Sequence, residues 1–124
     1  YTPFHLPYVQ VASTIARAAL GGDATVAPRG GPMCEVVTLA KRDLRAGEVL
    51  DGVGGFHAYG LVDNAAAARA ADALPMGLSE GARLLRDVPK DGLVRFADVE
   101  RPAGRRVDAL WAEQAARWPA GEAA

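Results

Sequence analysis

The sequence is poor in the residues that build disulfides, metal centres and membrane spans. Its 124 residues include one cysteine, Cys34, and two histidines. A single cysteine excludes an internal disulfide and a cysteine-rich zinc site, and it is typical of the reducing cytosol, so we expect a cytoplasmic location. The apolar runs fall far short of the roughly 18 residues that a membrane span needs. We also expect no secretory signal peptide, because no basic stretch leads into an apolar one.

Neither sign of charge dominates the chain. It holds 14 basic and 15 acidic residues, for a net charge of −1. Nucleic-acid-binding domains usually carry a basic excess, so we expect no nucleic-acid partner. Half of the residues are apolar and 23% are charged, which is the composition of one globular domain with its own core. The first residue is Tyr1 rather than Met, so we expect the chain to be part of a longer protein.

Glycine and proline divide the chain into short segments. The expected elements are an extended arm (1–8), a helix (9–20), a loop (21–32), a buried strand (34–40), a helix capped by Asn64 and ended by Leu74-Pro75 (65–73), and a helix (105–118). The first helix places Val11, Ile15 and Ala18 at helical spacing. Cys34 opens the strand, so we expect a buried, inert thiol.

Two segments resemble one another. Arg42-Asp43-Leu44 and Arg86-Asp87-Val88 each precede a polar turn, a glycine and an apolar pair. The glycines are Gly47 and Gly92, and the spacing differs by one residue at the turn. We interpret 42–50 as a first corner and 86–94 as a second corner, each a strand, a turn and a strand, related by approximate two-fold pseudosymmetry. The glycines supply the positive φ of each turn, and the aspartates accept turn N–H groups.

The segments 40–52, 55–64 and 74–100 resemble an SAF domain, the antifreeze-like β-clip module also found in sialic acid synthases and altronate dehydratases. The resemblance implies a mainly β fold (β-clip, SAF-like) with flanking α-helices. It divides the chain into a linker arm and helix (1–33), the SAF domain (34–102), and a C-terminal helix and tail (103–124).

Residues 1–28 resemble the segment that joins a homoserine-dehydrogenase-like NAD(P)-binding domain to a C-terminal SAF domain. The resemblance implies an NAD(P)-dependent oxidoreductase acting on a sugar, polyol or sugar acid, in which this chain shapes the substrate cleft or mediates assembly. NAD or NADP would bind the missing N-terminal domain, because no GxGxxG motif follows a strand here. We expect no cofactor in this chain and no activity from it alone. The alternative is a stand-alone carbohydrate-binding or assembly module; an independent enzyme has least support.

The candidate ligand-binding residues are Phe56, His57, Tyr59 and His5. The first three lie in the glycine-flanked segment 55–60, which we expect to line a concave surface that offers aromatic faces with polar tips to a sugar. His5 lies in the aromatic arm, where packing between domains is the competing interpretation. Neither histidine has metal-ligand spacing, so we expect no metal. The run 52–55 lacks the GK[ST] ending of a phosphate loop, so we interpret it as a turn.

The last predicted helix carries an apolar stripe. Val107, Leu110, Trp111 and Trp118 lie on one face of it. The simplest interpretation is packing, either on this domain or on something larger. Because the first and last helices leave apolar surface free, we expect a homo-oligomer in which Trp111 or Trp118 is covered by another chain.

Overall fold

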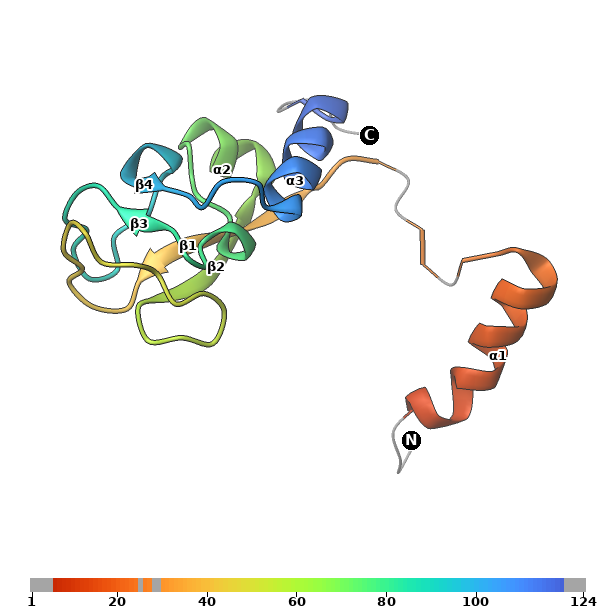
Figure 1. Cartoon of the computed structure of the whole chain (residues 1–124). Helices are drawn as coiled ribbons and strands as arrows, with labels where there is room; N and C mark the ends of the chain where they lie inside the picture. The colour runs from red at the N-terminus through yellow and green to blue at the C-terminus, as the bar shows by residue number, and fades with distance from the viewer. Residues whose placement is uncertain (1–5, 25, 28–29, 120–124) are drawn as a thin grey trace.

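Three α-helices, two 3₁₀ turns and four short strands follow one another in the computed structural model, which describes residues 6–24, 26–27 and 30–119 (Figure 1). In chain order they are α1 (Leu6–Gly21), β1 (Cys34–Ala40), β2 (Ala58–Asn64), α2 (Ala65–Ala70), η1 (Met76–Leu78), β3 (Arg83–Leu84), η2 (Phe96–Asp98), β4 (Val99–Glu100) and α3 (Arg106–Arg117). The strands form two separate antiparallel pairs, β1 with β2 and β3 with β4.

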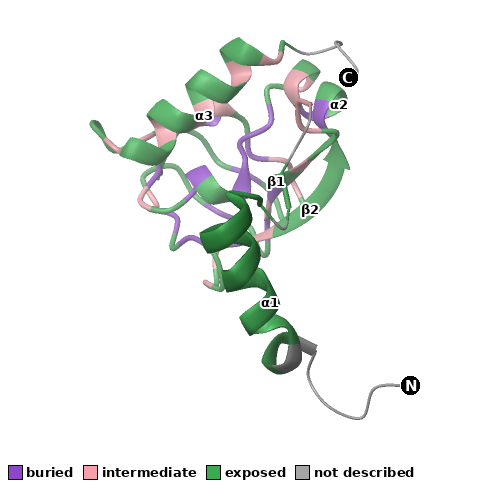
Figure 2. Ribbon diagram, turned by 90° about the vertical axis from the view of Figure 1, so that its right-hand side faces the viewer, coloured by how far each residue is buried: buried purple, intermediate pink, exposed green. Residues whose placement is uncertain are grey.

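The first helix begins earlier than its sequence pattern predicts. α1 starts at Leu6, inside the segment expected to be an extended arm. Pro7 is tolerated because the first turn of a helix has no internal partner for a backbone N–H. α1 stands apart from the rest of the described chain (Figure 1), and its described side chains are all exposed (Figure 2).

The second helix ends earlier than expected, and the third agrees with the prediction. Asn64 occupies the N-cap position of α2, but its side chain makes no capping hydrogen bond. α2 ends at Ala70, and Asp72 then takes a left-handed conformation with φ of 53°. This residue, rather than Leu74-Pro75, breaks the helix, because a left-handed residue cannot continue it. α3 covers 106–117, within one residue of the prediction at each end.

Only the first strand of the β1–β2 hairpin agrees with a prediction. β1 has the predicted bounds, whereas the sequence analysis assigned no strand to β2. The pairing runs from Cys34 opposite Asn64 to Ala40 opposite Ala58. The expectation that Cys34 is buried is wrong: the thiol is free and exposed. The buried positions of β1 begin only at Val37, because the first residues of the strand lie at the open end of the hairpin, away from the core.

The two corners exchange backbone hydrogen bonds with each other. The Leu44 N–H donates to the Val88 carbonyl at 2.8 Å, and the Val88 N–H donates to the Leu44 carbonyl at 2.9 Å. A shift of 44 residues carries Leu44 to Val88, and the same shift relates further bonds. The Leu50 N–H donates to the Ala82 carbonyl at 2.8 Å, and its counterpart is the bond from the Val94 N–H to the Thr38 carbonyl at 2.9 Å. The bond from the Leu84 N–H to the Glu48 carbonyl (2.8 Å) corresponds to that from the Ala40 N–H to the Gly92 carbonyl (3.0 Å). The bond from the Gly47 N–H to the Leu84 carbonyl (2.7 Å) corresponds to that from the Asp91 N–H to the Ala40 carbonyl (2.8 Å). These bonds confirm the predicted pseudosymmetry of the corners.

The structure corrects the alignment of the two turns. Gly47 has the expected positive φ of 89°, but its counterpart is Asp91, with φ of 61°, and not Gly92. With this pairing the one-residue difference in spacing disappears. Gly92 is required for another reason: a Cβ atom there would lie 2.7 Å from the Pro89 carbonyl oxygen. The turn is therefore too tight for a side chain at this position.

The core is drawn equally from both corners and from the segments that pair with them. Its buried members are Ala40, Leu44, Leu50, Leu74, Leu78, Ala82, Leu84, Val88, Val94 and Val99. A smaller cluster of Val37, Ala68 and Ala73 joins α2 to β1. The buried residues gather in the body around the two strand pairs (Figure 2). The described chain is a mixed α and β structure, so the expectation of a mainly β fold is met only in part.

Candidate functional site

Three of the four predicted ligand-binding residues lie next to one another where β2 begins. Phe56, in the preceding turn, is 85% exposed, while His57 and Tyr59 are partly buried. The Tyr59 hydroxyl donates to Oδ1 of Asp91 at 3.1 Å; burial, and then this bond, raise the pKa of Tyr59. His5 lies outside the described residues. The two rings at 57 and 59 are thus partly accessible, as expected, and ligand contact stays a prediction.

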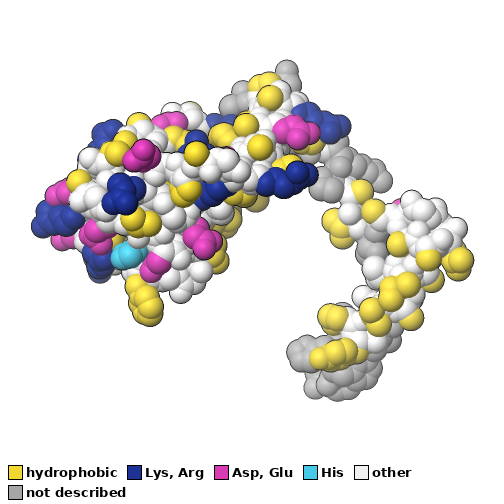
Figure 3. All heavy atoms as spheres, viewed as in Figure 1, with side chains coloured by type: hydrophobic (Ala, Val, Ile, Leu, Met, Phe, Trp, Pro, Cys, Tyr) yellow, Lys and Arg dark blue, Asp and Glu magenta, His cyan; other side chains and the backbone are white. Residues whose placement is uncertain are grey.

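His57 lies between two carboxylates. Its Nε2 atom is 3.7 Å from Oε2 of Glu48, and its Nδ1 atom is 3.4 Å from Oδ1 of Asp51. The Nδ1 atom is shielded from solvent and has no hydrogen-bond partner. In Figure 3 the cyan histidine is surrounded by acidic and basic side chains. The neighbouring acids therefore come from the first corner and from the residue that follows it.

The charges of this cluster largely satisfy one another. Glu48 accepts two hydrogen bonds from Arg42, at 2.5 and 3.2 Å, and one from the Arg45 N–H at 2.6 Å. The Arg42 bond, and then the Arg45 bond, lower the pKa of Glu48 to about 2. Burial acts to raise the pKa of Asp51, but the N–H groups of Phe56 and His57 outweigh it and hold this pKa below its usual range.

The glycine-rich segment before His57 is a turn, in agreement with the sequence interpretation. Gly52 and Gly54 have positive φ, and the Gly55 N–H donates to the Gly52 carbonyl at 3.3 Å. The Asp51 carboxylate accepts the next two N–H groups and fills the space beside Gly55, where a Cβ would lie 2.2 Å from it. The Asp51 carboxylate therefore takes the two N–H groups that follow the turn, those of Phe56 and His57, and its negative charge disfavours a phosphate beside them.

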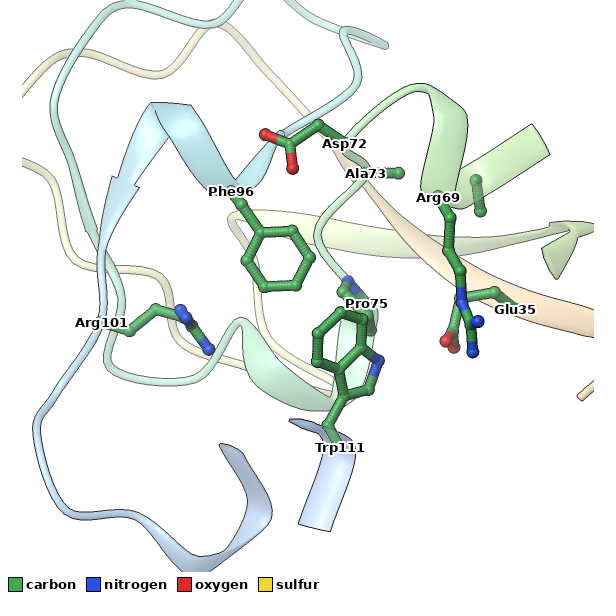
Figure 4. A pocket seen from close by; sticks show the side chains of 9 residues that line it. Glu35, Arg69, Asp72, Ala73, Pro75, Phe96, Arg101 and Trp111 are labelled. Carbon is green, nitrogen blue, oxygen red and sulfur yellow. The ribbon is translucent and has the colours of Figure 1, made fainter. Parts of the chain in front are cut away.

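A cavity of about 360 Å³ lies at the other end of the hairpin (Figure 4). It is lined by Glu35, Ala68, Arg69, Asp72, Ala73, Pro75, Phe96, Arg101 and Trp111. Glu35 is the second residue of β1, whereas His57 immediately precedes Ala58, which pairs with the last residue of β1. The two sites are therefore separated by the length of the hairpin. The cavity joins α2, η2 and α3, and its described lining does not include Phe56, His57 or Tyr59.

Two aromatic rings form one side of the cavity. The ring centroids of Phe96 and Trp111 are 5.0 Å apart, with a tilt of 47° between the planes. The Arg101 guanidinium lies over the Phe96 ring at 4.9 Å, and it also pairs with Asp108. Asp108 accepts a further ion pair from Arg105 at 2.6 Å, and this partner is the main cause of its lowered pKa. The aromatic wall is therefore fixed to α3 by ion pairs.

Charged tips of both signs surround the rings. Arg69 donates to the Trp118 carbonyl, which ties α2 to the end of α3. Asp72 accepts the Ala97 N–H at 3.2 Å. Together with Arg101 and Glu35, these side chains give the cavity two positive and two negative groups. The described residues of the lining thus offer aromatic faces together with charged groups of both signs, an arrangement that can bind a polar ligand.

Sequence reasoning missed this cavity. It assigned Trp111 to packing and gave Arg69, Asp72, Phe96 and Arg101 no role. These residues come from three segments far apart in the chain, and no local motif connects them. The one available signal was the apolar stripe of the last helix, which includes Trp111 but leaves open what the stripe packs on.

No protein-family model matches the chain, and no curated protein is detectably similar to it in sequence. Within the described residues, no cluster of three or more histidine, cysteine, aspartate or glutamate side chains could hold a metal ion. Among the helices described in the structure, none combines the length and apolar character needed to cross a membrane.

Proposed function

We propose that residues 34–102 form an SAF-type β-clip. The support is the hydrogen-bond exchange between the corners, which repeats bond for bond after a shift of 44 residues. The same shift relates core residues, Ala40 to Leu84 and Leu50 to Val94. The resemblance implies a β-clip, and two equivalent corners are consistent with it; in the chain, α1 precedes this module and α3 follows it.

We further propose that the chain is the non-catalytic binding domain of an NAD(P)-dependent oxidoreductase, and that it holds a sugar-acid-like ligand in the cavity beside Phe96 and Trp111. The cavity is the observation that carries this proposal. Its volume of about 360 Å³ lies in the range of small-molecule sites and leaves room for a monosaccharide. The C–H face of a sugar packs well on an aromatic ring, and arginine binds a carboxylate through two parallel hydrogen bonds.

The nicotinamide cofactor would bind elsewhere in the larger protein. A dinucleotide site needs glycines through which the backbone approaches the pyrophosphate. The described residues that line the cavity include no glycine, and the Asp51 carboxylate occupies the N–H groups of Phe56 and His57 at the end of the glycine turn. The isolated chain should therefore bind neither NAD nor NADP in a calorimetric titration. Micromolar binding of either cofactor would overturn the proposed division of labour.

Trp111 provides the test of the ligand site, because it is one of two tryptophans and the other can be replaced. In a Trp118→Phe background, glucuronate and gluconate should change the Trp111 fluorescence, and uncharged glucose should bind at least about tenfold more weakly because it lacks the carboxylate. Arg69→Gln should weaken binding of the acids to the level of glucose. Arg83→Gln, a matched exposed arginine in β3, should not.

The same titration separates the two candidate sites. His57→Gln should leave the affinity for glucuronate unchanged if the ligand occupies the cavity. Loss of affinity in His57→Gln, with Arg69→Gln unaffected, would move the site to residues 55–60. If none of the sugars binds up to millimolar concentration, the binding proposal is wrong, and the alternative of an assembly module without a sugar ligand gains support.

A further inference from the structure

α1 carries an apolar stripe that nothing in the described chain covers. Val11 and Ile15 are 54% and 62% exposed, and Ala18 continues their line at helical spacing. Arg17 is the only charged residue of this helix, and it pairs with Asp23 on the following loop. An isolated helix of 16 residues is marginally stable in water, so most of its stability must come from packing this stripe on another surface.

A matching apolar groove lies under α3. Val107 and Leu110 are on the stripe of α3 that faces the body, yet they remain 43% and 50% exposed. They border a second hollow of about 270 Å³, which is also lined by Glu35, Pro75, Gly77, Leu78, Trp111 and Gln114. α3 has no buried residue among its twelve. Its inner face is therefore only partly packed, and the hollow is large enough to take an aliphatic side chain.

The linker connects these two surfaces. It passes the end of α3, where Gly31 packs so closely on Trp118 that a Cβ would lie 2.8 Å from the indole. Trp118 is held in turn by Arg69 and lies under the Arg117 guanidinium, at 4.7 Å. The chain thus leaves the body beside the groove, but α1 stands away from it (Figure 1). Residues 22–30, between the end of α1 and this contact, can span about 30 Å when extended, which is enough to reach another molecule.

We propose that α1 of one copy packs into the groove under α3 of a second copy, and that the second copy returns the same contact. The exchange needs only segments already present in this chain, and two-fold symmetry gives both contacts at once. A typical stable interface buries about 1,600 Å² in total. One face of a helix about 24 Å long, packed in a groove, buries roughly half of that area. Two reciprocal contacts reach that area, whereas α1 against a single α1 does not. The groove shares Glu35, Pro75 and Trp111 with the cavity described above, but this proposal is argued from the apolar faces of α1 and α3 and does not require the ligand.

The first test is the mass in solution of the full chain. Light scattering should give twice the 12.9 kDa of one chain at tens of micromolar and a shift towards the monomer on dilution. Ile15→Asp should raise the dimer dissociation constant at least about tenfold, because it buries a charge. Ser13→Asp places the same charge on the opposite face of α1 and should leave it unchanged. A strict monomer at all concentrations, or equal effects of both variants, would overturn the proposal.

Disulfide trapping identifies the contact itself. In a Cys34→Ser background, one chain would carry Ile15→Cys and a second, differently tagged chain Leu110→Cys. Exchange predicts a crosslink between the two tags on oxidation and no such product when Ser13→Cys replaces Ile15→Cys. A chain carrying both Ile15→Cys and Leu110→Cys that crosslinks only within itself would show that α1 covers its own groove. That result would overturn the exchange.

Discussion

Asp43 and Asp87 each accept a backbone hydrogen bond from the opposite corner. Oδ1 of Asp43 accepts the Lys90 N–H at 2.8 Å, and Oδ1 of Asp87 accepts the Ala46 N–H at 2.9 Å. The shift of 44 residues that relates the corners carries one bond onto the other. Each aspartate therefore does not close its own turn but holds the two corners together.

Replacing either aspartate should loosen both corners. Asp43→Ala is expected to lower the free energy of unfolding by about 1 kcal/mol, the usual net value of one such bond, and Asp87→Ala should act in the same direction. Urea denaturation measures both. Glu100→Ala, which removes an exposed acid of β4 outside the corners, is the control and should unfold at the wild-type midpoint. If the control falls as far as Asp43→Ala, loss of an acidic residue rather than loss of the bond explains the effect.

The alignment of the turns makes a prediction about three glycines. Gly47→Ala should cost about 1 kcal/mol because φ is 89° there. Gly92→Ala should cost more, because its Cβ meets a backbone oxygen at 2.7 Å that cannot move away without opening the turn. Gly77→Ala is the control, since it has no neighbour within 4 Å and should be nearly neutral. Thermal unfolding ranks the three, and equal costs at 47 and 92 would contradict the distinction.

Much of the fold follows from local sequence signals. The run of β-branched residues predicts β1, the apolar stripe predicts α3, and the repeated Arg-Asp pattern predicts the two corners. The glycine of the second corner misled the alignment, because Asp91 adopts the left-handed conformation that glycine usually takes. β2 was not predicted because Gly60 interrupts its run of strand-forming residues. A side chain is disfavoured at this position, since a Cβ would lie 2.5 Å from Val36 across the hairpin.

The candidate sites were less predictable than the fold. The segment around His57 was visible because aromatic and glycine residues alternate within a few positions. Its acidic neighbours are Glu48 in the first corner and Asp51 just after it, and only folding brings these two carboxylates to the ring. The cavity at Phe96 and Trp111 depends on how α3 packs against η2. No local sequence pattern predicts this packing.

Acid should weaken the first corner within a defined pH range. The pKa of Glu48 is about 2 in the folded chain and about 4.5 in its ordinary state, so the folded form binds fewer protons than the unfolded form between these values. The contribution of Glu48 is complete above pH 4.5 and is lost as the pH falls towards 2. Urea midpoints across this range should decline less steeply in Glu48→Gln. An unchanged slope would show that other carboxylates carry the acid sensitivity.

A buried hydroxyl should stabilise the junction of β1 with the segment before η1. Thr38 is fully buried, and its hydroxyl donates to the Leu74 carbonyl at 2.8 Å, beside the backbone bond from the Thr38 N–H at 2.9 Å. Thr38→Val keeps the shape and the backbone bond but removes the donor, so it should cost about 1 kcal/mol. Thr14→Val on the exposed face of α1 provides the matched control. A neutral Thr38→Val would mean that the backbone bond alone satisfies the carbonyl.

The attachment of α3 should depend on the shape of the Arg105 side chain and not only on its charge. Its guanidinium donates to the Leu78 carbonyl at 3.0 Å, to the Glu80 carbonyl and, through two nitrogens at 2.6 and 3.1 Å, to Asp108. A lysine cannot reach these acceptors together, so Arg105→Lys should cost about 1–3 kcal/mol and shift the fluorescence of Trp111 towards that of an exposed indole. Arg106→Lys, one residue further on the exposed side, should change neither quantity. If Arg105→Lys lowers stability while the Trp111 emission stays unchanged, the arginine stabilises η1 alone and α3 is held by its aromatic contact.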